Sequence, residues 1–286
     1  MAKNKQILRR IHVVEYTKKI TQAMKMVSVA KLGRLKRAKS ALRPYSDGLQ
    51  ALFLRTLQTA GPQVLGAFTQ KRAVKHVLCL VVTASRGLCG TYNNRVFQSL
   101  ARYHAACLSA RCKVTFLPIG QKGLQHLKIK NLPYHEEYVG LFETLDFERV
   151  QHLGDYLLGS FLQNRYQNIV MLSQTSLQGA PVEPQSLLPY ALPKVSKEED
   201  MTLYEPKAPP LLQKLIREIA ALRLYQNLLA AWETEHKSRI MVMGQSTDNA
   251  EELLKKLQTT YNRIRKASVT RDLIETSAGM ASSPAS

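Results

Sequence analysis

Apolar residues recur at spacings of three and four over the last third of the chain, which places them on one stripe of a helix. Pro209 and Pro210 stand near its expected start, where a missing amide proton costs nothing. The pattern predicts a single helix within residues 205–286, roughly 90 Å long if about sixty residues are helical. Such a length is typical of a coiled coil or a shaft. The stripe comprises Leu215, Ile219, Leu222, Gln226, Leu229, Ile240, Met243, Leu254, Leu257, Tyr261 and Ile264.

A second helical pattern covers residues 1–60. Pro44 is expected to kink this helix or to end it at Arg43. Neither terminal helix has a partner nearby in sequence, so we expect the two to pair as an antiparallel coiled coil. The stripe begins with Ile7, Ile11 and Val14, continues slightly shifted as Val13, Thr17, Ile20, Met24 and Val27, and resumes as Leu35, Ala38, Leu42, Tyr45 and Leu49.

The middle of the chain has a different periodicity. Residues 76–83 form a nearly continuous apolar run, as expected of a strand buried on both faces. Further strands are expected at 113–119 and 168–173, and helices at 93–108 and 143–165. Alternating strands and helices predict a Rossmann-like α/β domain with a mostly parallel sheet, within residues 70–195. Residues 176–210 carry seven of the twelve prolines and are expected to form a loop or edge region and then a connector.

The charge narrows the range of partners. A net charge of +20 favours a polyanionic partner, which could be a nucleic acid, an anionic membrane face or an acidic protein surface. From Lys3 to Arg43 there are thirteen Lys or Arg residues and one acid, Glu15. No apolar run is long enough to span a membrane, and the N-terminus lacks the apolar core of a signal peptide.

Few residues suggest catalytic or cofactor chemistry. The turn after the first strand contains Arg86, Gly87, Cys89 and Gly90, but it matches neither GxGxxG nor a P-loop. We interpret it as a structural turn, with an anion site or a Cys89 nucleophile as weaker alternatives. His236 lies among acidic and basic residues on the last helix, where a polar coiled-coil layer is favoured over a metal site. The four cysteines form no CxxC pair, so no metal or other cofactor is expected.

Several separated motifs resemble the gamma subunit of F-type ATP synthases, in the family's order along the whole chain. At the N-terminal end the residues are ITQAMKMV at 20–27, and in the middle RGLCG at 86–90. At the C-terminal end they are MVMGQSTDNA at 241–250 and LQTTYNR at 257–263. The chain departs from the family at Lys266, where a Gln is usual, and at Trp232, an uncommonly bulky residue.

The resemblance implies a rotor without an active site or bound nucleotide of its own. Its partners would be the alpha and beta subunits of the catalytic head, the epsilon subunit and the c-ring, and not nucleic acid. It would lie peripherally on the cytoplasmic face of a bacterial inner membrane. Three other classes stay open: a subunit of a paralogous rotary ATPase, a basic nucleic-acid-binding coiled coil, and an α/β enzyme with coiled-coil arms. The contacts to the head that the resemblance implies are Met24, Lys25, Glu235, Arg239, Arg265, Lys266 and Thr270.

Overall fold

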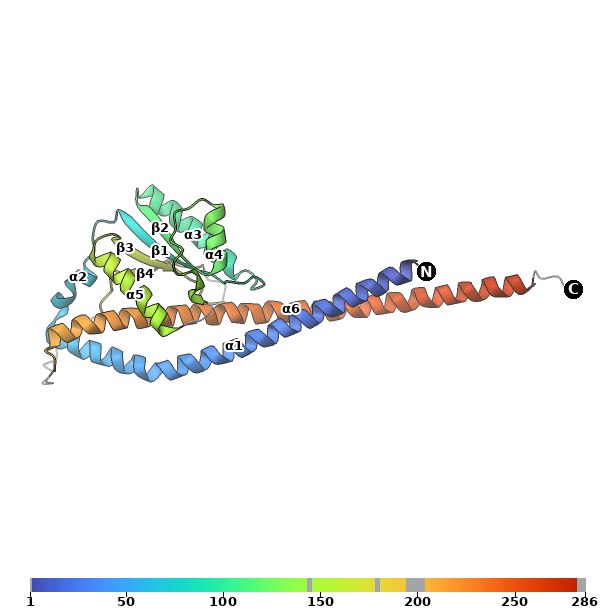
Figure 1. The fold of residues 1–286 in the computed structure, drawn as a ribbon, viewed down its shortest axis with the longest axis horizontal. Helices are drawn as coiled ribbons and strands as arrows, with labels where there is room; N and C mark the ends of the chain where they lie inside the picture. Colours follow the sequence, from blue (N-terminus) through green and yellow to red (C-terminus); the bar gives the residue numbers. More distant parts are fainter. Residues whose placement is uncertain (1, 143–145, 178–180, 194–203, 282–286) are drawn as a thin grey trace. The chain divides into compact units, whose positions relative to one another are not determined.

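The structure is a computed structural model that describes residues 2–142, 146–177, 181–193 and 204–281. It divides into two compact units. The first contains residues 1–29 and 240–286, and the second contains residues 30–239. Two long helices, α1 (Ala2–Ala60) and α6 (Ala208–Ala281), contribute to both units (Figure 1). No helix among the described residues is long and apolar enough to cross a membrane.

A four-stranded sheet forms the centre of the second unit. Its strands are β1 (His76–Val82), β2 (Lys113–Ile119), β3 (Asn168–Leu172) and β4 (Gln185–Leu188), in the order β2-β1-β3-β4. β1 pairs in parallel with β2 and β3, and β4 adds to β3 in the antiparallel sense. The predicted mostly parallel sheet is thus confirmed, and the antiparallel edge strand lies in the proline-rich region.

Alternate residues of the strands enter two different cores. On one face, Leu78 and Leu80 pack with α5 (Phe147–Leu162) and with the parts of α1 and α6 that belong to this unit. On the other face, Val77 and Cys79 pack with α3 (Tyr92–Ser109) and α4 (Gln121–Ile129). Figure 1 shows α3 and α4 on one side of the sheet and α5 on the other. Burial on both faces explains the continuous apolar run of β1.

The paired helices are antiparallel in each unit. In the first unit, Thr21 Oγ1 lies 2.9 Å from Thr247 Oγ1, and Lys18 forms a 2.7 Å ion pair with Glu251. In the second unit, Gln226 donates a 2.7 Å hydrogen bond to Ser46, and Lys39 forms a 3.2 Å ion pair with Glu233. In both units the partner number falls as the α1 number rises, which confirms the predicted antiparallel coiled coil.

The stripe predicted for the start of α1 is wrong in its second half. Ile20 and Val27 are more than half exposed, whereas Thr21 and Ser28 are buried between the helices. The small hydroxyl residues can line the seam because each bonds a carbonyl of the preceding turn, Thr21 that of Lys18 and Ser28 that of Met24. A pattern search that counts only apolar side chains therefore selects the neighbouring stripe.

Other boundaries differ by small amounts. The helix α1 continues through Pro44, so the alternative of an end at Arg43 is wrong. The helix expected from residue 143 begins at Phe147, because Asp146 accepts a hydrogen bond from the amide of Glu148 and caps it; residues 143–145 lie outside the described residues. The sequence analysis missed α4 and three short elements, η1 (Pro62–Leu65), α2 (Gly66–Thr69) and η2 (Val139–Phe142).

Candidate functional site

The turn between β1 and α3 is held by side chains of α6. Ser238 donates a 2.7 Å hydrogen bond to the carbonyl of Cys89. Arg239 donates through Nη2 to the carbonyls of Arg86, at 3.2 Å, and Gly87, at 3.3 Å. A planar guanidinium with five donors suits this task, because it can bond several carbonyls at once. The turn is thereby fastened to the long helix.

A buried ion pair supports this arrangement. Glu235 Oε1 lies 2.7 Å from Arg239 Nη2, one helical turn along α6, and both residues are buried. Burial raises the pKa of Glu235, although the adjacent Arg239 charge opposes the rise. The ion pair fixes the guanidinium that bonds the turn. The cluster around His236 is therefore a junction between α6 and the α/β domain, and not the polar coiled-coil layer predicted from the sequence.

His236 is neutral at physiological pH. Burial, with the charges of Arg239 and Lys31, lowers its pKa from 6.5 to about 4. Its Nδ1 lies 3.4 Å from Arg239 Nη1, and an arginine can only donate, so Nδ1 is the acceptor. The ring proton is consequently on Nε2.

We expect acid to destabilise this junction through His236. The unfolded chain binds a proton near pH 6.5 that the folded protein excludes until about pH 4. Above pH 6.5 His236 does not destabilise the folded protein. Its destabilising effect grows as the pH is lowered toward 4 and is constant below that. The full lowering of the His236 pKa corresponds to a loss of about 3 kcal/mol in the free energy of unfolding. Urea unfolding followed by the fluorescence of Trp232, the single tryptophan, measures this dependence.

The matched comparison for this prediction uses two histidine variants. His236→Gln should show a flatter decline in stability below pH 6.5 than the unaltered protein. His152→Gln, which replaces an exposed histidine of α5, should leave the slope unchanged. Equal slopes for all three proteins would contradict the assignment.

The structure separates the residues expected to contact the head into two groups. Lys25, Arg265, Lys266 and Thr270 belong to the first unit and are exposed, and Met24 in the same unit is half-buried. Glu235 and Arg239 belong to the second unit and are engaged inside it. Direct contact with a partner stays a prediction for all seven residues. For the buried two, the geometry adds an internal role that their place in the sequence did not reveal.

Exposed apolar side chains follow α1 in the first unit. Val13, Tyr16, Ile20 and Val27 are each exposed by more than half of their surface, and their spacing keeps them near one face of the helix. We call these four residues the α1 apolar stripe. Large exposed apolar groups on a helix whose other face is already paired indicate a surface for a further partner.

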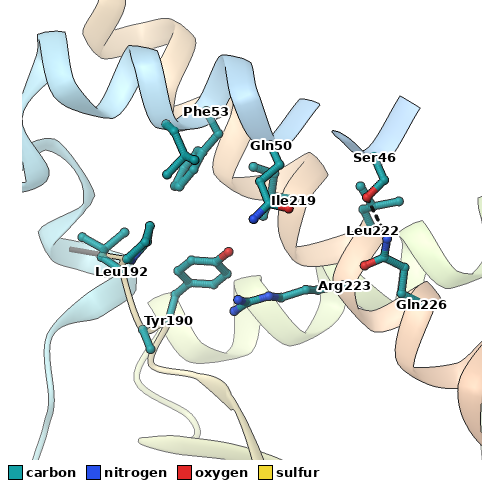
Figure 2. A pocket seen from close by; sticks show the side chains of 12 residues that line it. Ser46, Gln50, Phe53, Tyr190, Leu192, Ile219, Leu222, Arg223 and Gln226 are labelled. Carbon is teal, nitrogen blue, oxygen red and sulfur yellow. Dashed lines mark hydrogen bonds between the residues drawn. The ribbon is translucent and has the colours of Figure 1, made fainter. Parts of the chain in front are cut away.

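Several cavities lie in the second unit beside its part of α6. One of about 160 Å³ is lined by residues of the junction. Another, of about 220 Å³, lies among α1, α6 and the chain after β4 (Figure 2). In Figure 2 the Arg223 guanidinium points toward the ring of Tyr190, 4.8 Å from its centroid, and Gln50 points into the same space. The sequence analysis anticipated neither cavity, because each collects residues from segments far apart in the chain.

Comparisons with known proteins agree in their result. A family model described as ATP synthase matches residues 3–282. The ATP synthase gamma chain of Flavobacterium johnsoniae is 34% identical over 279 residues, which cover 96% of each chain. That of Amoebophilus asiaticus is 30% identical over 282 residues, covering 96% of this chain and 97% of the relative. A chain of the Euglena gracilis mitochondrial ATP synthase (OSCP/F1/c-ring) has the same fold, with a TM-score of 0.62 at 16% identity over 98% of this chain and 94% of that one.

Proposed function

This chain belongs to the ATP synthase gamma-chain family and is a central-stalk rotor subunit, and we propose that it couples rotation of a membrane c-ring to conformational change in the alpha and beta subunits of a catalytic head. The epsilon subunit is a further proposed partner. We place the chain peripherally on the cytoplasmic face of a bacterial inner membrane. In this role the rotor supplies no reacting group and acts by favouring one conformation of a neighbouring subunit over another.

The observation that carries the proposal is the construction of the first unit. Its two helices are joined by a hydrogen bond between Thr21 and Thr247 and by the ion pair of Lys18 with Glu251. The α1 apolar stripe and a row of exposed cations are left on the outside. Contacts of these kinds suit a shaft that must turn, because apolar contact is non-directional and buried fixed ion pairs are costly to break.

The basic surface also fits an acidic partner. In the first unit the exposed cations of α1 include Arg9, Arg10, Lys19 and Lys25, and α6 adds Arg265 and Lys266. Long-range attraction of this kind steers association without requiring one fixed geometry. Membership of the gamma-chain family favours acidic protein surfaces over nucleic acid as the partner, and it gives no support to a free-standing α/β enzyme.

Charge reversal near the end of α6 tests the proposal directly. We expect Arg265→Glu combined with Lys266→Glu to lower ATP turnover by the assembled complex roughly five- to ten-fold, the factor given by about 1–1.4 kcal/mol. Both side chains are exposed, so the variant should fold normally. The measurement is steady-state ATPase activity of the purified complex at equal subunit content.

A matched double reversal is available elsewhere on the surface. Arg102→Glu with Lys130→Glu changes the net charge equally at exposed positions of the α/β domain. This control should retain turnover. Unchanged turnover in the Arg265 and Lys266 variant would remove both residues from the contact surface.

Co-purification tests the partners themselves. An affinity-tagged full-length chain, isolated in mild salt, should bring alpha, beta and epsilon subunits and ATPase activity with it. Recovery of nucleic acid alone would overturn the proposal.

A further inference from the structure

The smaller cavity at the junction gathers residues from three separate segments. It is lined by Lys31 of α1, by Ser85 and Arg86 of the turn, and by the α6 residues Trp232, Glu235, His236 and Arg239. All seven belong to the second unit. The turn had suggested an anion site only weakly from its sequence. The fold now places its Ser85 and Arg86 with two further cations, Lys31 and Arg239, and with the buried side chains of Glu235 and His236.

Unpartnered buried polar atoms are concentrated at this cavity. Among the described residues, seven buried side-chain polar atoms have no hydrogen-bond partner within the protein. Three of them belong to residues that line it, namely Ser85 Oγ, Glu235 Oε2 and His236 Nε2. Glu235 is 4% exposed and His236 is 3% exposed. Buried polar groups without a partner cost free energy, so their clustering around one space indicates a ligand that bonds them together.

The protons of the lining groups define the ligand. Nε2 of His236 carries a hydrogen, because Nδ1 accepts from Arg239. Ser85, Lys31 and Arg86 supply further donors. Among the described residues that line the cavity, Glu235 is the one carboxylate, and it is already paired with Arg239. In the described part of this lining, Glu235 Oε2 is the unpartnered atom that can only accept. The site thus offers several donors, an excess of positive charge and one acceptor.

We propose that this cavity is a binding site for inorganic hydrogenphosphate. Three phosphate oxygens would accept from the cations, Ser85 and His236, and the remaining P–OH would donate to Glu235 Oε2. A cavity of about 160 Å³ has room for such an ion. Charge-assisted bonds from lysine and arginine to a phosphate are among the stronger hydrogen bonds in proteins. The inference goes beyond the rotor function and does not depend on it.

The acceptor gives the site a selectivity. Inorganic phosphate keeps at least one hydroxyl proton at neutral pH, whereas sulfate keeps none and would place an oxygen lone pair against the Glu235 carboxylate. A phosphate ester loses its last proton near pH 6, so at neutral pH it resembles sulfate in this respect. We therefore expect free phosphate to bind more tightly than either sulfate or the terminal phosphate of ADP.

Titration calorimetry of the full-length chain with sodium phosphate at neutral pH tests the site. We expect saturable binding of one phosphate per chain, and roughly ten-fold weaker binding in Ser85→Ala and in Arg86→Ala, each of which removes one donor. Arg37→Ala, which removes an exposed α1 cation that does not line the cavity, is the matched control and should bind normally. Far-ultraviolet circular dichroism of each variant verifies that it is folded.

Glu235→Gln separates the role of the acceptor from that of the charge. An amide can donate to an oxyanion, so this variant should lose the preference for phosphate over sulfate and bind both. The proposal would be overturned by an absence of saturable heat up to about 10 mM phosphate, a concentration that would nearly fill a site with a Kd of about 1 mM. Equal binding by the Ser85, Arg86 and control variants would overturn it as well. In either case the rotor function would be unaffected.

Discussion

Replacing Arg239 by alanine is expected to lower the free energy of unfolding of the second unit by about 3–5 kcal/mol. The substitution leaves Glu235 buried without its counter-charge. It also removes the donors bonded to the carbonyls of Arg86 and Gly87, so that one substitution both leaves a charge uncompensated and releases the turn. Urea unfolding followed by Trp232 fluorescence provides the measurement.

Two comparisons isolate the cause of this loss. Arg239→Ala combined with Glu235→Gln should be less destabilised than Arg239→Ala alone, since no buried charge is then left unpaired. Arg217→Ala, at an exposed position of the same helix, should change stability by no more than about 0.5 kcal/mol. An Arg239→Ala variant as stable as Arg217→Ala would show that the junction does not hold the turn.

Replacing Gly120 by alanine is expected to lower the free energy of unfolding by at least about 3 kcal/mol. Strain at positive φ contributes about 1–3 kcal/mol, and the steric overlap of the added Cβ adds to it. Gly120 has φ +111°, and an added Cβ would overlap the backbone carbonyl of Thr83 and stand 2.9 Å from its Oγ1. The Thr83 hydroxyl also accepts a 2.8 Å hydrogen bond from the amide of Gly123. The close approach joins the end of β1 to the start of α4, where no flexible side chain can yield.

A glycine-to-alanine substitution on α1 should change the stability in the opposite direction. Gly48 lies inside that helix with no atom within 4 Å of an added Cβ. Gly48→Ala should therefore stabilise the protein by about 0.5–1 kcal/mol. Thermal unfolding of the two variants beside the unaltered protein checks both signs, and a Gly120→Ala variant as stable as the unaltered protein would contradict the expected overlap.

Continuous, strongly patterned segments could be predicted from the sequence. The strand at Lys113–Ile119 has the expected bounds, and β1 and β3 end within one residue of theirs. In these segments the apolar run and its flanking turns are sufficient to predict the strand and its bounds. The helix α4 was missed because it is short and contains Gly123, and only Leu124 and Leu127 of its side chains carry the helical spacing into the core.

The register of the seam and the junction could not be predicted in the same way. Choosing between the stripes of α1 requires knowing that Thr21 meets Thr247, a contact 226 residues away in sequence. The role of Arg239 likewise depends on a turn 152 residues away. Such contacts are set by how the elements pack, and neither local spacing nor composition contains that information.

The α1 apolar stripe also affects how long an unassembled subunit persists in a cell. Its four side chains remain exposed to water as long as the subunit has no partner. Exposed apolar patches promote aggregation, and chaperones and proteases continuously remove the unfolded and aggregation-prone fraction of a protein. A newly made copy that does not assemble should accordingly be short-lived. If partner subunits cover the α1 apolar stripe in the assembly, as we propose, the number of copies that persist should follow the supply of those subunits.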